Sequence, residues 1–137
     1  MTIRITAILV ILTLIFVVIF FYFLNQNSKI TELIVTQDPL NTAKSEKTFA
    51  DDSKNIYLLI KLNRVKKGEK VKVSWFKNED EASKTLVQNN NVIIEKQGSG
   101  FIKISLLNKN GNYKKGTYEI IVSLNENTEK SLYFSIR

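Results

Sequence analysis

The chain of 137 residues contains no cysteine, no histidine and only one proline. Without cysteine there is no disulfide and no thiol nucleophile, and without histidine there is no imidazole base and no ordinary structural zinc site. A domain free of cysteine is unusual among secreted eukaryotic proteins and ordinary among bacterial and archaeal ones, so the composition indicates a prokaryotic origin. Two large groups of catalytic and metal-binding chemistry are therefore excluded.

Carboxylates are the remaining groups that could act as acid and base, and they cluster at Asp51-Asp52 and at Glu79-Asp80-Glu81. Both clusters lie in polar segments, where solvated turn residues are the simpler explanation, and a calcium ion needs about six to eight oxygens from converging loops. Gly98-Ser99-Gly100 lacks the Lys-Ser/Thr of a phosphate-binding loop and predicts a hairpin turn. We predict no enzyme activity, no catalytic residue, no metal and no cofactor.

Charge is missing from the start of the chain, where Ile5 to Leu24 form one apolar run. As an α-helix the run is about 30 Å long, roughly the hydrocarbon thickness of a bilayer. Its threonines, Thr6 and Thr13, do not argue against lipid because a helical threonine can donate to a carbonyl one turn earlier. The run predicts a transmembrane helix whose partner is the lipid bilayer.

Residues 1–29 are predicted to be a retained signal-anchor with a polar exit at 25–29. The apolar run is longer than that of a cleaved signal, no small-x-small site follows it, and aromatic residues crowd its end at 20–23. Arg4 flanks one side, whereas Lys29 on the other is offset by Glu32. The positive-inside rule then predicts a single-pass protein of the cell membrane with a cytoplasmic N-terminus and an extracytoplasmic C-terminal domain.

Strict alternation of apolar and polar residues dominates the domain at 30–137, which is the period of strands with one buried side. The first strand is predicted at 30–35, and 36–55 reads as a polar loop or linker in which Phe49 packs against the domain edge. No amphipathic helix follows the anchor. The pattern predicts an all-β antiparallel sandwich of seven to eight strands, with further strands at 56–62, 70–76, 85–87, 92–94, 101–107, 117–124 and 131–137.

The strands around Trp75 and Tyr118 resemble those of an immunoglobulin-like sandwich. Such domains carry a tryptophan on the third strand, here in VKVSW, and a Gly-x-Tyr approach to the sixth, here Gly116-Thr117-Tyr118. The resemblance implies that the Tyr118 hydroxyl bonds back to the preceding loop. Ile120 stands where the family has its second cysteine, and the strand 56–62 has no first one. The chain thus resembles the disulfide-free bacterial and archaeal versions, and this fold alone implies no function.

Several residues that the alternation places on the outside of the sandwich are large and apolar. In an immunoglobulin-like order, the strands that bear Phe76, Ile121 and Tyr133 are neighbours, so these three residues are predicted to form an exposed apolar strip, a feature that often marks an interface. The alternative is that the linker 36–55 or a neighbouring loop covers them. The candidate interface residues are Phe76, Ile121, Tyr133, Tyr57, Leu59 and Phe101.

We therefore expect a non-enzymatic, membrane-anchored binding or structural subunit that acts through contacts with another protein or with itself. The net charge of +7 allows an acidic surface polymer as a further partner, although the lysines are scattered, and nucleic acid fits poorly with a domain outside the membrane. The alternative is a subunit of an archaeal pilus or archaellum-like filament, in which Thr6, Ala7 and Thr13 would permit close helix packing. The early Arg4 argues against that alternative.

Overall fold

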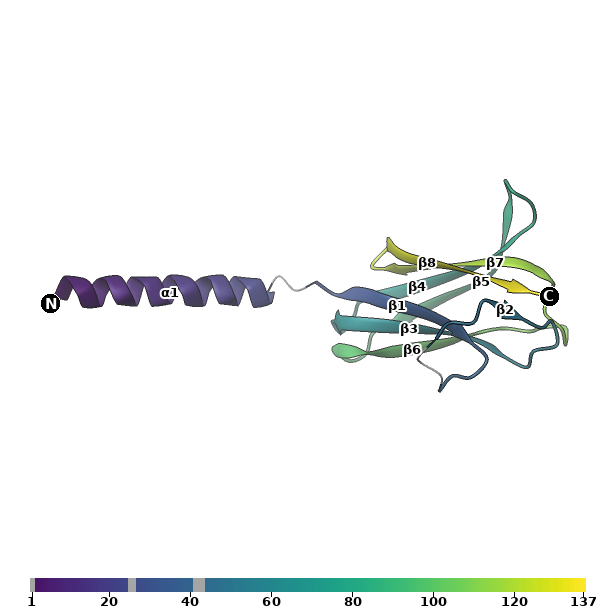
Figure 1. The fold of residues 1–137 in the computed structure, drawn as a ribbon, viewed down its shortest axis with the longest axis horizontal. Helices are drawn as coiled ribbons and strands as arrows, with labels where there is room; N and C mark the ends of the chain where they lie inside the picture. Colours follow the sequence, from purple (N-terminus) through teal and green to yellow (C-terminus); the bar gives the residue numbers. More distant parts are fainter. Residues whose placement is uncertain (1, 25–26, 41–43) are drawn as a thin grey trace.

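In its described residues the chain forms one N-terminal helix followed by eight strands in two sheets; Figure 1 shows their arrangement. The computed structural model describes residues 2–24, 27–40 and 44–137. The helix α1 spans Thr2–Leu24. The strands are β1 Lys29–Thr36, β2 Thr48–Phe49, β3 Ile56–Val65, β4 Lys70–Asn78, β5 Lys84–Ile93, β6 Gly98–Leu106, β7 Gly116–Leu124 and β8 Asn127–Ile136.

Helix α1 is apolar on every side and stands apart from the sheets (Figure 1). Its segment Ile5–Leu24 has a mean hydropathy of 3.2 and none of it is buried against the domain, so its length and composition suffice to cross a bilayer. The Thr13 hydroxyl donates to the Leu9 carbonyl at 2.8 Å, the expected bond to the preceding turn. The predicted helix is thus confirmed. Of the predicted exit at 25–29, residues 25 and 26 lie outside the described residues.

The strands form a three-stranded sheet in the order β1-β3-β6 and a five-stranded sheet in the order β2-β8-β7-β4-β5. The pairs are antiparallel except for β2 with β8, which are parallel. The two sheets lie face to face (Figure 1) and contribute inward residues to one hydrophobic core. In β7 every second residue is buried, as the predicted alternation requires: Tyr118, Ile120, Val122 and Leu124. The mostly β fold is confirmed.

Four aromatic rings meet at the centre of this core, around Phe134 of β8. Its ring stacks on Tyr118 at a centroid distance of 5.2 Å. Trp75 and Phe49 approach the same ring edge-on at 6.3 and 5.6 Å. Offset-stacked and edge-to-face contacts of this kind are worth about 0.5–1.5 kcal/mol each beyond the area they bury. Strands β2, β4, β7 and β8 are therefore held together without a disulfide.

The linker predicted at 36–55 is more structured than its polar composition indicates. The Glu46 amide donates to the Val35 carbonyl at 2.7 Å, so the linker runs along the outer edge of β1. Further on, β2 pairs with β8, and the Ser135 amide donates to the Lys47 carbonyl at 2.9 Å. Phe49 lies in the core rather than at the domain edge. The linker therefore covers the edge of one sheet at Val35 and the edge of the other at Ser135 and Ile136; its residues 41–43 lie outside the described residues.

Strand β5 corrects a second expectation, because it runs without a break from Lys84 to Ile93. Residues 89–91, predicted as a turn between two short strands, all pair with β4. The side chain of Asn90 accepts a hydrogen bond from the Trp75 indole at 3.2 Å. Cross-strand pairing thus outweighs the turn propensity of asparagine. Gly98-Ser99-Gly100, also predicted as a turn, begins β6.

Phe49→Ala tests whether the linker is a structural part of the domain. The Phe49 ring is buried against Phe134, so its removal should lower the free energy of unfolding by about 3–5 kcal/mol. The measurement is denaturant unfolding of the full chain in detergent, followed by the emission of Trp75, the single tryptophan. Leu40→Ala is the control in the same linker, where the side chain is 87% exposed, and should leave stability unchanged. Equal stability of the two variants would contradict this role.

Candidate interaction surface

The outer face of the five-stranded sheet brings together side chains from β4, β5, β7 and β8. The strand register places Leu86, Phe76, Glu119 and Tyr133 in one row across the sheet, since each residue pairs with the next. Ile121 lies in the adjoining row, opposite Ser74. Residues paired across strands share one face, so this row is a continuous surface feature.

A charged pair lies at the centre of the row. The Lys84 ammonium is 2.9 Å from a carboxylate oxygen of Glu119 and 4.5 Å from the centroid of the Phe76 ring. The other carboxylate oxygen accepts a hydrogen bond from the Tyr133 hydroxyl at 3.0 Å. The bond from Lys84 lowers the pKa of Glu119 below its usual value, and the same carboxylate raises the pKa of Tyr133. The cluster is thus a preorganised polar centre flanked by aromatic rings.

The predicted apolar strip is therefore interrupted. Phe76, Ile121 and Tyr133 do share one face, but Phe76 and Ile121 are half-buried, and Glu119 lies between Phe76 and Tyr133. Tyr133 is 56% exposed. Leu86, which is 52% exposed and pairs with Phe76, was not among the sequence candidates. Its place in the row follows only from the continuity of β5.

The remaining interface candidates lie on the three-stranded sheet and do not form an exposed patch. Leu59 is only 2% exposed, and its partner across β1, Ile34, is buried as well, so the expectation that Leu59 faces solvent is wrong. Tyr57 is half-buried, with the Lys103 ammonium 5.5 Å from its ring centroid. Phe101 is exposed beside Lys61, whose ammonium lies 6.0 Å from the ring.

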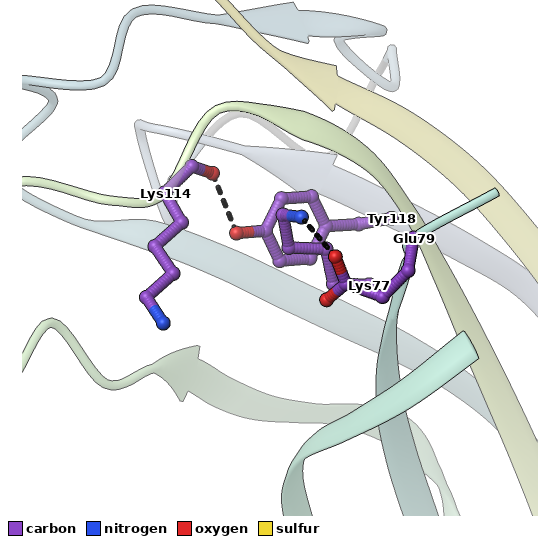
Figure 2. A network of polar contacts seen from close by, with 4 residues as sticks. All are labelled: Lys77, Glu79, Lys114 and Tyr118. Carbon is purple, nitrogen blue, oxygen red and sulfur yellow. Dashed lines mark hydrogen bonds and ion pairs between the residues drawn. The ribbon is translucent and has the colours of Figure 1, made fainter. Parts of the chain in front are cut away.

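The far end of the domain holds a cleft between the β4–β5 hairpin and the β6–β7 connection. Figure 2 shows its wall, where the Tyr118 hydroxyl donates to the Lys114 carbonyl at 2.6 Å and Lys77 pairs with Glu79 at 3.1 Å. Burial raises the pKa of Tyr118, and the charge of Glu79 adds to that shift. The hydroxyl bond back to the preceding loop is the one expected for Tyr118, which is buried together with Trp75 and Ile120.

The acidic clusters serve local structure. The Asp80 carboxylate accepts hydrogen bonds from the amides of Ala82 and Ser83, both at 2.8 Å, and these bonds lower its pKa. Asp51 pairs with Lys115 at 3.5 Å. Within the residues that the structure describes, no three His, Cys, Asp or Glu side chains group closely enough to hold a metal ion.

The residues proposed for helix packing, Thr6, Ala7 and Thr13, lie on α1 and are exposed. Thr6 and Thr13 are one heptad apart, so they lie near the same face of the helix. Among the described residues, nothing buries the segment Ile5–Leu24 on which this face lies.

Lys84→Met tests the polar centre. Loss of the ammonium should raise the pKa of Glu119 towards its usual value, as measured by titration of ¹³C-labelled glutamate with NMR on the full chain. Because the folded-state pKa is lowered, the pair stabilises the fold above the unfolded-state pKa, and this contribution is lost as the pH falls through the folded-state value. Lys115→Met, which removes a distant pair, should leave Glu119 unchanged. An identical Glu119 titration in wild type and Lys84→Met would refute the arrangement.

No known protein family matches the sequence, and no curated protein does. Among solved structures, a β-glucosidase involved in saponin metabolism from intestinal bacteria aligns with a TM-score of 0.50 at 11% identity, over 82% of this chain and 16% of that one. The alkylpurine DNA glycosylase AlkC of Pseudomonas fluorescens aligns with a TM-score of 0.48 at 16% identity, over 80% of this chain and 30% of that one. The chain thus spans less than a third of either protein, and the likeness concerns the fold alone.

Proposed function

We propose that this chain is a non-enzymatic, single-pass membrane protein that holds an immunoglobulin-like sandwich outside the cytoplasm as a binding or structural subunit. The observation that carries the proposal is an isolated apolar helix joined to a β domain in which the sheet edge at β5 lies beside an aromatic row. The absence of histidine and cysteine from the sequence favours binding over catalysis. The partner is a protein, either a different one or a second copy of this chain.

Strand order supports the immunoglobulin-like part of the proposal. The sequence β8-β7-β4-β5 corresponds to the G-F-C-C′ sheet of such domains, and β1-β3-β6 corresponds to A-B-E. Trp75 then lies on strand C, and the bond from the Tyr118 hydroxyl to the Lys114 carbonyl corresponds to the tyrosine corner at strand F. Ile120 is fully buried at the place of the second cysteine, so aliphatic and aromatic packing replaces the disulfide.

The membrane part rests on α1 and on its flanks. The helix is apolar all round, as lipid requires, and it makes no buried contact with the domain. Arg4 before the apolar segment Ile5–Leu24, against Lys29 and Glu32 after it, favours a cytoplasmic N-terminus. The absence of cysteine supports a prokaryotic cell surface.

The binding part rests on the free edge of β5. The linker covers the outer edge of β1 at Val35 and that of β8 at Ser135 and Ile136, and on β6 the Gln88 side chain donates to the Ser105 carbonyl and accepts from the Leu107 amide. Strand β5 carries no proline and only one charge, Lys84, so it lacks the usual protection of an edge strand. If a partner added a strand to β5, the parts of the partner next to that strand would contact the row formed by Leu86, Phe76, Glu119 and Tyr133.

Leu86→Glu tests this surface. A charge at the edge of the row should reduce recovery of the bound protein by about tenfold or more, because a residue central to an interface contributes about 2 kcal/mol. The measurement is quantitative mass spectrometry of proteins that co-purify with the full chain in mild detergent. Leu40→Glu is the control, since Leu40 is also exposed but lies in the linker, which in its described residues contacts β1 and β8 and not β5. Equal loss with both variants, or loss with neither, would count against the β5 edge.

Asn110→Cys tests the topology, since the natural chain has no cysteine that would interfere. Asn110 is exposed in the β6–β7 connection, so in intact cells its thiol should react fully with a membrane-impermeant maleimide. Thr2→Cys is the control and should react only after the membrane is opened. Labelling of Thr2→Cys alone in intact cells would reverse the orientation. Release of the protein as filaments by shearing would instead favour the pilus-like alternative.

A further inference from the structure

Four segments meet at the end of the β domain from which β1 starts. Lys29 of β1 pairs with Asn63 of β3, and Val65 pairs with Gly98 of β6. The Gly68 amide donates to the Ile94 carbonyl at 2.8 Å, and the Asn125 amide donates to the Lys70 carbonyl at 2.8 Å. We call this region the basic end, because its segments carry the cations Lys29, Arg64, Lys66, Lys67, Lys70 and Lys96.

In the residues that the structure describes, the cations of the basic end form no salt bridge, although the charge of Lys66 acts on Glu69. All six are exposed, and the ion pairs found in the described part of the chain lie elsewhere, on Lys77, Lys84 and Lys115. The same segments carry fewer carboxylates than cations: Glu69, Glu95 and Glu126. The positive charge of this end is therefore free to attract an external anionic partner.

Hydrogen bonds fasten the segment that follows α1 to this end. The Glu69 carboxylate accepts from the Ser28 hydroxyl at 2.9 Å, from the Lys66 amide at 2.7 Å and from the Asn125 side chain at 3.2 Å. Burial alone would raise the pKa of Glu69, but these bonds together lower it. The Ser28 hydroxyl also lies 2.9 Å from the Arg64 carbonyl. The turn between β3 and β4, which carries Lys66 and Lys67, is thus fixed to Ser28, the residue that precedes β1.

The length of the connection then places the basic end close to the membrane. This step rests on the membrane insertion proposed above. From Leu24 to Lys29 there are five Cα steps, which span at most about 17 Å when extended. The headgroup layer on one side of a bilayer is about 5–7 Å thick. If Ile5–Leu24 fill the hydrocarbon, the basic end faces the headgroups, whereas the β4–β5 hairpin is at the opposite end of the domain (Figure 1).

We propose that the basic end binds anionic phospholipid headgroups of the membrane that holds α1. Lysine and arginine next to a membrane surface are attracted to anionic lipids, and the tether keeps this surface permanently within reach. Ile93, 62% exposed and paired with Lys70, adds an apolar contact at the same end. The contact holds the domain upright, which leaves the β5 edge and the aromatic row accessible along the side of the domain.

The experiment uses the full chain reconstituted into vesicles of phosphatidylcholine alone, or of equal parts of phosphatidylcholine and phosphatidylglycerol. A fluorophore is attached to Gln97→Cys at the basic end or to Asn110→Cys at the opposite end; both replaced residues are exposed and neutral. A nitroxide on a fraction of the phosphatidylcholine headgroups quenches fluorophores at that depth. We expect quenching of the Gln97→Cys label to be several-fold stronger in the anionic vesicles than in the neutral ones. High salt should abolish this increase. Quenching of the Asn110→Cys label should be the same in both vesicle types.

Charge variants identify the residues. Replacing Arg64, Lys66 and Lys67 by glutamine should lower the population of the headgroup-bound state about fivefold for each cation removed. Replacing Lys54, Lys109 and Lys114 by glutamine removes the same charge at the opposite end and should change nothing. If the Gln97→Cys label is quenched equally in the two vesicle types, while the protein is inserted and the Trp75 emission is native, the lipid contact is refuted and the membrane insertion stands. A chain that does not float with either vesicle overturns the membrane insertion and this inference with it.

Discussion

The contact of Phe134 with three other rings is the interaction on which the rest of the domain depends. Trp75 and Tyr118 bring β4 and β7 to this contact, and Phe49 brings the linker. Because Phe49 is anchored in the core, the linker is held against β8 and also runs along β1. The same aromatic packing therefore holds the linker where it meets β1 and β8.

The elements that the sequence predicted correctly are those whose pattern is local. Alternation in β7 needs only adjacent residues to reveal its buried face, and the absence of charge in Ile5–Leu24 is enough to predict the apolar helix. Both features follow from the period of a strand or helix, so one sequence suffices. The hydroxyl bond from Tyr118 to Lys114 was expected for a different reason, the resemblance of Gly116-Thr117-Tyr118 to the Gly-x-Tyr of immunoglobulin-like domains.

The features that escaped prediction depend on residues far apart in the chain. Asn89 to Asn91 have the composition of a turn and become strand only because β4 pairs with them. Leu59 is buried by tertiary packing outside the main core, although alternation places it outward. Lys84 and Glu119 are separated by 35 residues, so their contact requires the strand order to be known. For that reason the polar centre of the candidate surface could not be predicted from the sequence, whereas the apolar residues Phe76, Ile121 and Tyr133 around it were predicted.

The antiparallel pairing of β1 with β3 has a mechanical consequence for a domain held by its N-terminal helix. The pairing runs from Lys29 opposite Asn63 to Thr36 opposite Tyr57, and its hydrogen bonds lie across the strand direction. If α1 is held in a membrane as proposed, a pull on the opposite end of the domain enters at Lys29 and runs along β1. Such a pull loads these bonds in shear, all together, instead of peeling them one by one. A domain attached through Lys29 is therefore pulled in a direction that its first strand resists.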